Sequence, residues 1–349
     1  MFIPAILTTI LGVVVIYSSS PTLAIQQTVF GLFGFGLFYF LRNLNYRYLT
    51  NLIKPAYFVT LALLVVVFLL GAETRGSLRW IPLGVFNLQP SEFAKPVLIL
   101  ALAYFWSKNY PSWTNIAKSL GIVSPVAVLI FKQPDLGTTI TIIFIWIVMF
   151  LCSNVSWLKV MVIALIGGLV TPLGWFFLKS YQKERFMSFL SPTADPQGIG
   201  YNVIQSTIAV GSGEFSGRGL GHGTQSRLQF LPEFRTDFIF ASIAEELGLL
   251  GTLIVLALYL VMFFFLFRII THSGDKFGEL IAVGVSAMLF IQIVINIGMN
   301  AGIMPITGIT LPLLSYGGSS IITVLLSLGL ASSVEKYGMK KKEIMNFSF

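Results

Sequence analysis

The sequence is poor in charge, cysteine and histidine, and each shortage excludes a class of protein. Only 10% of its 349 residues are charged, while 56% are hydrophobic, whereas a soluble domain carries roughly 25% charged residues. We therefore expect a lipid bilayer, and not water, to be its main solvent. The single cysteine, Cys152, excludes an internal disulfide. The two histidines, His222 and His272, lack the partners that a zinc site needs.

The net charge of +8 does not indicate a nucleic-acid-binding protein, because the lysines and arginines are dispersed between apolar runs instead of forming a stripe. No linker or low-complexity tract divides the chain, so we predict a single transmembrane domain over residues 1–349. The first twenty residues resemble a signal peptide in hydrophobicity. They lack a basic start, however, and another apolar run follows at once, so we interpret them as a first spanning helix.

The apolar runs predict an all-α, polytopic membrane protein of about ten transmembrane helices, because a spanning helix takes about 20 apolar residues. Two of the runs are short and separated only by the turn at Gln133–Asp135, so a re-entrant pair is an alternative there. The expected spans are 2–20, 22–41, 52–71, 91–108, 116–132, 136–152, 157–178, 238–268, 277–300 and 312–334.

Positive charge in the short connections sets the orientation, since lysine and arginine accumulate on the cytoplasmic side. With the N-terminus inside, the outer short loops hold only Arg75 and Arg79. The C-terminus is then cytoplasmic as well. The cytoplasmic connections and tail hold Arg42, Arg47, Lys54, Lys108, Lys118, Lys159, Arg268, Lys276, Lys336, Lys340, Lys341 and Lys342.

The long segment of residues 179–236 would then lie outside the membrane. Interleaved apolar residues such as Val203 and Phe230 indicate an ordered cap, and a loop of this length is usually functional or disordered. Its many glycines do not match the G-x-G-x-x-G nucleotide pattern. We interpret the segment as an ordered, functional extracellular loop.

Ionisable residues converge on the outer starts of three expected helices. Glu92, Lys95, Asp135 and Asp237 fall at a similar depth, and such residues in a membrane protein mark function or a specific pairing. Structural interpretations compete with this one. Either aspartate could cap a helix, and Glu92 and Lys95, three residues apart, could neutralise each other.

The neighbouring Glu245 and Glu246 cannot both share the helical face of Asp237, and bonds to helix ends or backbone explain them best. Glu233 is grouped with them as a structural or cavity residue.

A carboxylate kept ionised beside a lysine can accept a proton from a hydroxyl group. Arginines could bind a diphosphate, and paired carboxylates could instead hold a divalent cation such as Mg²⁺ or Mn²⁺. Sequence does not decide between these. The candidate substrate-binding residues are Arg79, Arg227, Arg235, Ser315 and Ser319.

Four motifs together resemble those of the SEDS family (shape, elongation, division and sporulation). The elongation branch, RodA, fits better than the division branch, FtsW, because GTQS at Gly223–Ser226 precedes the third motif and Ala244 follows it. In chain order the motifs are QPSEFAK at Gln89–Lys95, QPDLGT at Gln133–Thr138, FLPEFRTDFIF at Phe230–Phe240 with AEELG at Ala244–Gly248, and LPLLSYGGSS at Leu311–Ser320.

The resemblance implies an inverting peptidoglycan glycosyltransferase that polymerises lipid II on the outer face of the bacterial cytoplasmic membrane for cell elongation. Asp237 would be the general base, Lys95 would orient or tune it, and Glu92 and Asp135 would organise the cavity. A class B penicillin-binding protein and elongation-complex proteins would be its partners.

Two alternatives stay open at this stage. A lipid II flippase would place polar groups near the bilayer midplane, where Glu245, Glu246, Asn296 and Asn300 could lie. A structural scaffold would leave the carboxylates as helix caps.

Overall fold

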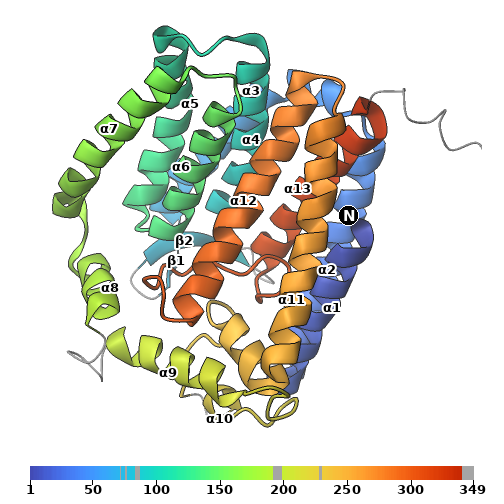
Figure 1. Cartoon of the computed structure of the whole chain (residues 1–349), viewed down its shortest axis with the longest axis vertical. Coiled ribbons are helices and arrows are strands. Elements are labelled where there is room, and N and C mark those ends of the chain that lie inside the picture. The colour runs from blue at the N-terminus through green and yellow to red at the C-terminus, as the bar shows by residue number, and fades with distance from the viewer. Residues whose placement is uncertain (71, 75–76, 83–86, 192–198, 228–229, 340–349) are drawn as a thin grey trace, which may run out of the picture.

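Each of the ten expected spans corresponds to a helix, which confirms the predicted all-α membrane architecture. The computed structural model in Figure 1 describes the chain except residues 71, 75–76, 83–86, 192–198, 228–229 and 340–349. The ten helices are α1 (Phe2–Ser19), α2 (Pro21–Asn43), α3 (Ile53–Leu70), α4 (Pro90–Lys108), α5 (Trp113–Lys132), α6 (Leu136–Leu151), α7 (Trp157–Gly174), α11 (Ile239–His272), α12 (Lys276–Asn300) and α13 (Gly318–Gly338).

Among the described residues, seven helices are long and apolar enough to cross a membrane. They are α1, α2, α5, α7 with its extension to Phe177, α11, α12 and α13. Helices α3 and α6 are shorter apolar helices. The remaining one, α4, has 19 residues and carries Glu92 and Lys95 in its first turns. The turn between α5 and α6 separates two helices of 20 and 16 residues, so each expected short span exists as a helix of its own.

Local signals fix where several helices start. Pro21 opens α2 and Pro90 opens α4, because proline is tolerated where the backbone N–H has no helical partner. The Ser112 hydroxyl accepts a hydrogen bond from Asn115 N and caps α5. Asp275 accepts one from Gly278 N and caps α12.

The expected span 312–334 starts too early, because α13 begins only at Gly318. Residues 311–317 form turns, with Leu313 at φ 66° and with the Leu311 N–H bound to the Ser315 hydroxyl at 2.8 Å. These local bonds compete with the helix for the backbone, so the segment leaves the helical path.

A small antiparallel sheet between α3 and α4 is not predicted from the sequence. Its strands β1 (Ala72–Thr74), β2 (Ser77–Pro82) and β3 (Asn87–Leu88) lie in the order β1-β2-β3. Ala72 pairs with Trp80, and Ile81 pairs with Leu88. The sheet brings Arg79 of β2 close to the turn between α5 and α6.

Helices α12 and α13 form the centre of the bundle, and α7 lies at its edge (Figure 1). In their apolar windows 72% and 83% of the residues are buried, whereas none is buried in the window of α7. Short 3-10 helices follow α2 (η1, Tyr46–Asn51) and α7 (η2, Trp175–Phe177).

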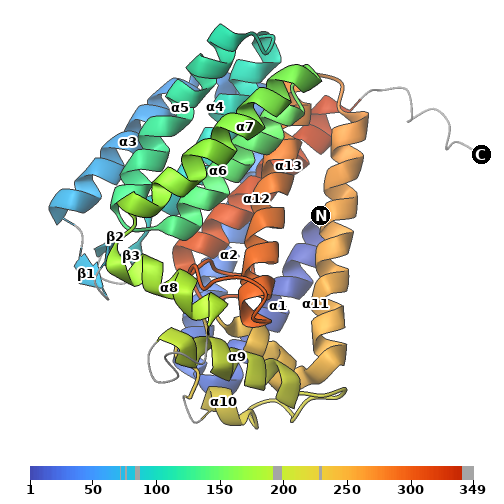
Figure 2. The ribbon, with the colours of Figure 1, turned by 60° about the vertical axis from the view of Figure 1, so that its left-hand side comes forward.

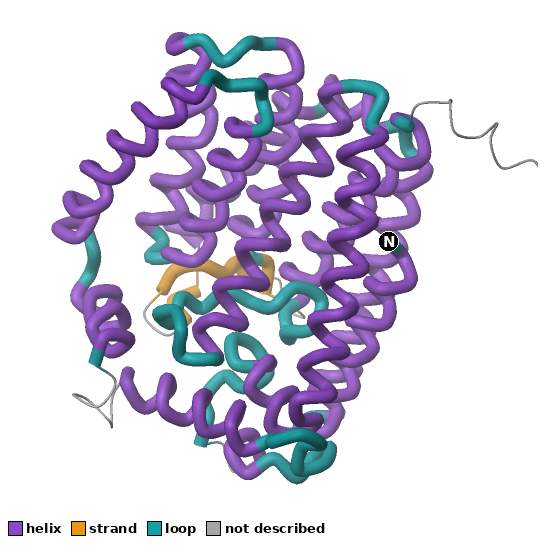
Figure 3. The backbone as a smooth tube through the Cα atoms, in the orientation of Figure 1, coloured by secondary structure: helices purple, strands orange, loops and turns teal. Residues whose placement is uncertain are grey.

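The segment between α7 and α11 folds over one end of the bundle as α8 (Ser180–Leu190), α9 (Ile199–Ser212) and α10 (Thr224–Arg227). Figure 2 shows α9 and α10 at the lower end of the bundle and α8 above them, near the sheet. Figure 3 shows loops and the sheet gathered just above them. We call this the cap end; α4, α6 and α11 all start toward it.

Helix α11 is interrupted at Gly248, which has φ 65° and ψ −160°. At 1.5 Å per residue its 34 residues would measure about 51 Å, longer than a hydrocarbon core of about 30 Å. The break separates a first part, 239–247, at the cap end from a second part that runs through the bundle.

The loop 214–219 supplies the hydrogen bonds that the break removes from α11. Arg218 N donates to Glu245 O at 3.0 Å and Gly219 N to Glu246 O at 3.0 Å. In return Leu249 N donates to Glu214 O at 2.9 Å and Leu250 N to Phe215 O at 3.2 Å. These four groups would otherwise pair with each other along the helix, so the loop is inserted into the backbone ladder of α11.

Candidate active site

The first turns of α4 contribute a buried ion pair. Lys95 Nζ lies 2.7 Å from Glu92 Oε1, and the two side chains are 1% and 7% exposed. Glu92 Oε2 makes no hydrogen bond to the described residues. Within that part of the chain the ion pair of Lys95 is with Glu92 and not with Asp237. Pairing offsets the cost of burying each charge only while both partners stay in place.

Asp135 acts as the N-cap of α6 and ties it to the start of α4. Its carboxylate accepts hydrogen bonds from Thr138 N at 3.1 Å and from the Thr138 hydroxyl at 2.9 Å. Gln89 and Ser91 donate to the same carboxylate at 3.3 and 3.4 Å. Asp135 therefore caps a helix, which is the structural interpretation that the sequence left open for it.

Arg79 reaches from β2 to the turn that precedes α6. Its Nε donates to Gln133 O at 3.2 Å, its Nη2 donates to Pro134 O, and its Nη1 lies 4.0 Å from Asp135 Oδ1. Tyr181 of α8 also donates to Pro134 O, at 3.0 Å. The sheet, α6 and α8 thus meet at one turn.

Asp237 stands apart from this pattern because it precedes α11 and does not cap it. The N-cap position is Phe238, which has no side-chain cap bond. Gly308 lies beside the aspartate: a Cβ atom at Gly308 would be 3.5 Å from Asp237 Oδ2 and 3.9 Å from Arg185 Nη1. The carboxylate and the guanidinium therefore flank the same glycine of the segment between α12 and α13.

Arg185, on α8, is a site residue that the sequence analysis missed. The pKa of Arg185 is lowered, first because the guanidinium is buried; Asp237 opposes this shift and Arg79 adds to it. The field of Asp135 also acts on Arg185, so two arginines and two aspartates share one electrostatic environment. Nothing in the segment SYQKERF distinguishes Arg185 from its basic neighbours, although Tyr181 and Arg185, four residues apart, stack at 5.7 Å.

The two candidate serines bind backbone within the protein. The Ser315 hydroxyl donates to Thr236 O at 2.6 Å and accepts from Leu311 N at 2.8 Å. The Ser319 hydroxyl accepts from Gln89 N at 3.0 Å and donates to Asn87 O at 3.2 Å. The Ser315 hydroxyl joins the segment between α12 and α13 to Thr236, and the Ser319 hydroxyl joins the start of α13 to the residues before α4.

The remaining candidates at the cap end make internal contacts as well. Arg235 donates to the hydroxyl and the carbonyl oxygen of Ser19 at 2.8 and 3.1 Å. Glu233 accepts from the Thr236 hydroxyl at 3.0 Å. Arg227 ends α10, and its side chain lies outside the described residues.

Glu245 and Glu246 are buried and bind the loop that precedes α11. Glu245 Oε1 accepts from Gln225 N at 2.8 Å, at the start of α10. Glu246 accepts from the Ser18 hydroxyl at 3.0 Å and from Gly221 N at 3.1 Å. Both glutamates therefore bind backbone N–H groups of the preceding loop, which indicates a structural role for them.

Within the described part of the chain, the carboxylates do not form a cluster that could hold a metal ion. One oxygen of Glu92 is bound by Lys95, and the oxygens of Asp135 are bound by Thr138, Gln89 and Ser91. Among the described residues no group of three His, Cys, Asp or Glu side chains is placed to hold a cation. Divalent cations prefer several oxygen ligands, so the described carboxylates do not fit Mg²⁺ or Mn²⁺.

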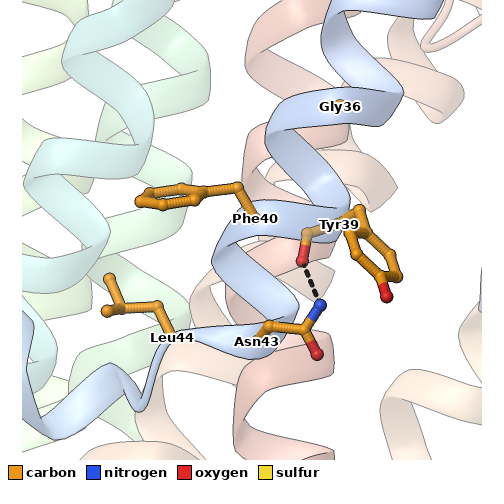
Figure 4. Close-up of a pocket in the computed structure, with 5 residues that line it drawn as sticks. All are labelled: Gly36, Tyr39, Phe40, Asn43 and Leu44. Atoms are coloured by element: carbon orange, nitrogen blue, oxygen red, sulfur yellow. Dashed lines mark hydrogen bonds between the residues drawn. The ribbon is translucent and has the colours of Figure 1, made fainter.

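A shallow depression of about 330 Å³ lies at the C-terminal end of α2, away from the cap end and the candidate site. Figure 4 shows that one helix supplies its walls and that the Asn43 side chain binds back to Tyr39 O. It contains no side chain that is charged at neutral pH. It is lined by Gly36, Tyr39, Phe40, Asn43 and Leu44.

The chain is similar in sequence to known bacterial proteins. The peptidoglycan glycosyltransferase MrdB of Escherichia coli is 42% identical over 284 residues, which cover 80% of this chain and 77% of that protein. The stage V sporulation protein E of Bacillus subtilis is 36% identical and covers 94% of this chain and 93% of its own.

Solved structures agree with the fold. A chain of a peptidoglycan synthase complex superposes with a TM-score of 0.83 at 34% identity, covering 96% of both chains. The rod shape determining protein RodA of Thermus thermophilus superposes with a TM-score of 0.74 at 28% identity, covering 97% of this chain and 96% of that one. The family model described as cell cycle protein, for FtsW, RodA and SpoVE, matches residues 1–340. The chain therefore belongs to the FtsW, RodA and SpoVE family.

Proposed function

We propose that this chain is a peptidoglycan glycosyltransferase that polymerises lipid II, with Asp237 as its general base. The observation that carries the proposal is the position of the Asp237 carboxylate, outside helix α11 and beside Gly308 and Arg185. The Asp237 carboxylate is therefore not the N-cap of α11. The relatives named peptidoglycan glycosyltransferases support the reaction class.

In the proposed reaction Asp237 accepts the proton of the 4-hydroxyl of the acceptor sugar as that oxygen attacks the anomeric carbon of a lipid-linked donor. The new glycosidic bond forms as the bond to undecaprenyl diphosphate breaks, and the configuration at the anomeric carbon inverts. A general base contributes typically 10²- to 10⁴-fold to the rate.

Arg185 and Arg79 suit the departing diphosphate. Asp237 and Asp135 both act on Arg185, and Arg79 lies 4.0 Å from Asp135. Guanidinium groups bind phosphate oxygens in pairs of parallel hydrogen bonds. A cation beside the leaving group stabilises the negative charge that develops on it. Lys95, which pairs with Glu92, would act on the site through that pair and not by contacting the base.

We place the site on the outer face of the cytoplasmic membrane. The supporting observation is the charge asymmetry of the short connections, in which lysine and arginine favour the end opposite to the cap end. Arg75 and Lys340–Lys342, which enter that count, lie outside the described residues. A class B penicillin-binding protein and elongation-complex proteins are the proposed partners; a relative of known structure occurs in a peptidoglycan synthase complex.

Labelling of single cysteines in intact cells tests the orientation. Cys152 is first replaced by serine, and one cysteine is then introduced in place of an exposed residue, Glu214 at the cap end or Tyr48 at the opposite end. A membrane-impermeant maleimide should label the first site and spare the second. The reverse pattern would invert the proposed topology.

Glycan synthesis by purified protein tests the activity. The protein, supplied with its partner synthase and lipid II, should form glycan chains. Asp237→Asn, which keeps the shape of the side chain, should lose this activity by at least about 100-fold. Glu214→Gln, which neutralises an exposed carboxylate at the same end, is the matched control and should stay within twofold of wild type.

The same preparation separates the enzyme from the flippase. Normal synthesis by Asp237→Asn would remove Asp237 from the mechanism. Absence of synthesis by the wild type, with lipid II still crossing the vesicle membrane, would favour transport. Glu245 and Glu246 bind the loop before α11. These contacts favour the enzyme over the flippase, because they give the two buried acids a structural role in place of a role in transport.

A further inference from the structure

Two asparagines of α12 bind the backbone carbonyl of Asp237. Asn296 Nδ2 donates to Asp237 O at 2.9 Å, and Asn300 Nδ2 donates to the same oxygen at 3.1 Å. Both asparagines are fully buried, with 0% exposure. They lie four residues apart on one face of α12, and Asn300 Nδ2 also donates to Asn296 O at 2.8 Å.

The amide of Asn300 takes the place of a missing helical hydrogen bond. In a continuous helix Ala241 N would donate to Asp237 O, four residues earlier. Here Ala241 N donates to Asn300 Oδ1 at 3.1 Å, and Asn300 Nδ2 donates to Asp237 O at 3.1 Å. One side-chain amide thus binds both the N–H of Ala241, in the first turn of α11, and the carbonyl oxygen of Asp237, so that these two groups do not pair and Asp237 stays outside the helix.

Asn296 joins the same carbonyl to the opposite wall of the site. Its Nδ2 donates to Ile309 O at 2.7 Å as well as to Asp237 O. Ile309 follows Gly308, whose backbone faces the Asp237 carboxylate. A single amide therefore sets the distance between the residue that carries the carboxylate and the glycine against which the carboxylate lies.

We propose that Asn296 and Asn300 are positioning residues for Asp237. They touch no reacting atom; they fix the backbone from which the base reaches the acceptor hydroxyl. The inference rests on the proposed function of Asp237 as the base. Small displacements of a catalytic group are costly, since a shift of about 1 Å can reduce the rate by about 10²-fold.

The test compares the kinetics of three α12 variants in the lipid II polymerisation assay. Asn296→Leu removes the hydrogen bonds that Asn296 donates to Asp237 O and to Ile309 O. Asn300→Asp keeps the shape and the acceptor for Ala241 N but loses the amide donors. Gln292→Leu is the matched control, because Gln292 is equally buried on the same helix and its Oε1 makes no hydrogen bond to the described residues.

Asn296→Leu and Asn300→Asp should each lower kcat by about 10- to 100-fold and leave KM for lipid II within about threefold. A purely structural role would instead reduce the folded fraction, which lowers the number of active sites without changing kcat per folded molecule. Folded protein is therefore quantified in each preparation by size-exclusion chromatography. Gln292→Leu should stay within about twofold of wild type in both constants.

Wild-type kcat in both asparagine variants, or an equal loss in Gln292→Leu, would overturn the inference. If Asn296→Leu does not fold, the near-isosteric Asn300→Asp decides the question alone. Asp237→Asn is assayed in parallel to separate the two proposals. If that variant is active, the base assignment fails; if it is inactive while both asparagine variants are normal, only the positioning role fails.

Discussion

The buried ion pair of Lys95 and Glu92 allows the structural and the catalytic interpretation of α4 to be separated. We consider Lys95→Met, Glu92→Gln and the double variant. Nζ and Oε1 are 2.7 Å apart, with side chains 1% and 7% exposed. Removal of one partner from such a pair leaves an uncompensated charge and typically costs about 3–5 kcal/mol, whereas replacement of both partners is often close to neutral.

Lys95→Met should therefore lower the unfolding free energy by about 3–5 kcal/mol, because ionised Glu92 would then be buried with no cation beside it. Proteins are stable by only about 5–15 kcal/mol, so a thermal scan of the purified protein should show a clear fall in Tm. The double variant should recover most of that loss, which gives a favourable coupling energy in the double-mutant cycle.

Lipid II polymerisation by the same preparations distinguishes the two interpretations. If the pair organises the active site, the double variant regains stability but stays at least about tenfold less active than wild type. Recovery of both stability and activity would refute the functional interpretation and leave the pair as mutual neutralisation. Unchanged stability of Lys95→Met would refute the energetic reasoning itself.

Three further predictions address other parts of the molecule. Gly308→Ala should cost about 1–2 kcal/mol at φ +75° and reduce polymerisation, because its methyl group would enter the space beside Asp237; normal kcat would contradict this placement. Arg185→Gln should raise KM for lipid II with little change in Tm, and a fall in kcat alone at constant KM would argue against diphosphate binding. The pKa of Asp275 is lowered from its ordinary 3.8, because hydrogen bonds from Tyr46, Gly278 N and Arg47 outweigh the effect of burial, which raises it. Its stabilisation is therefore present above about pH 4 and is lost as the pH falls through the lower folded-state pKa. Asp275→Asn should lower Tm at pH 7, and the difference from wild type should shrink in acid; a difference that grows below pH 4 would reverse the sign of the argument.

Hydropathy predicted the helices well because each span is a long apolar run, a signal that needs no tertiary information. It misplaced the start of α13 by six residues, since Leu311–Gly317 are apolar enough to extend the run yet use side-chain bonds such as that of Ser315. The short strands β1–β3 carry too few residues for a clear alternating pattern.

The candidate site was predictable in part. Position at a helix start identified Asp135 and Asp237, but the sequence could not tell which one caps its helix, because that depends on whether the chain turns before or after the carboxylate. The structure distinguishes them: Thr138 N donates to Asp135, the N-cap of α6, whereas the N-cap position of α11 is Phe238, one residue after Asp237. Arg185 was not predictable, since its proximity to Asp237 depends on how α8 packs against the loop that carries Gly308.

The insertion of loop 214–219 into α11 constrains how the protein can be assembled. The loop is synthesised before the helix, and the helix carries Glu245 and Glu246, which lipid does not solvate. Without the loop, the carbonyls of both glutamates and the N–H groups of Leu249 and Leu250 would stay without partners for as long as the break at Gly248 persists, and they would pair with each other only in a continuous helix. The broken form of α11 therefore completes its hydrogen bonding only when the preceding loop has folded against it, and the direction in which the first part of α11 leaves Asp237 depends on that loop.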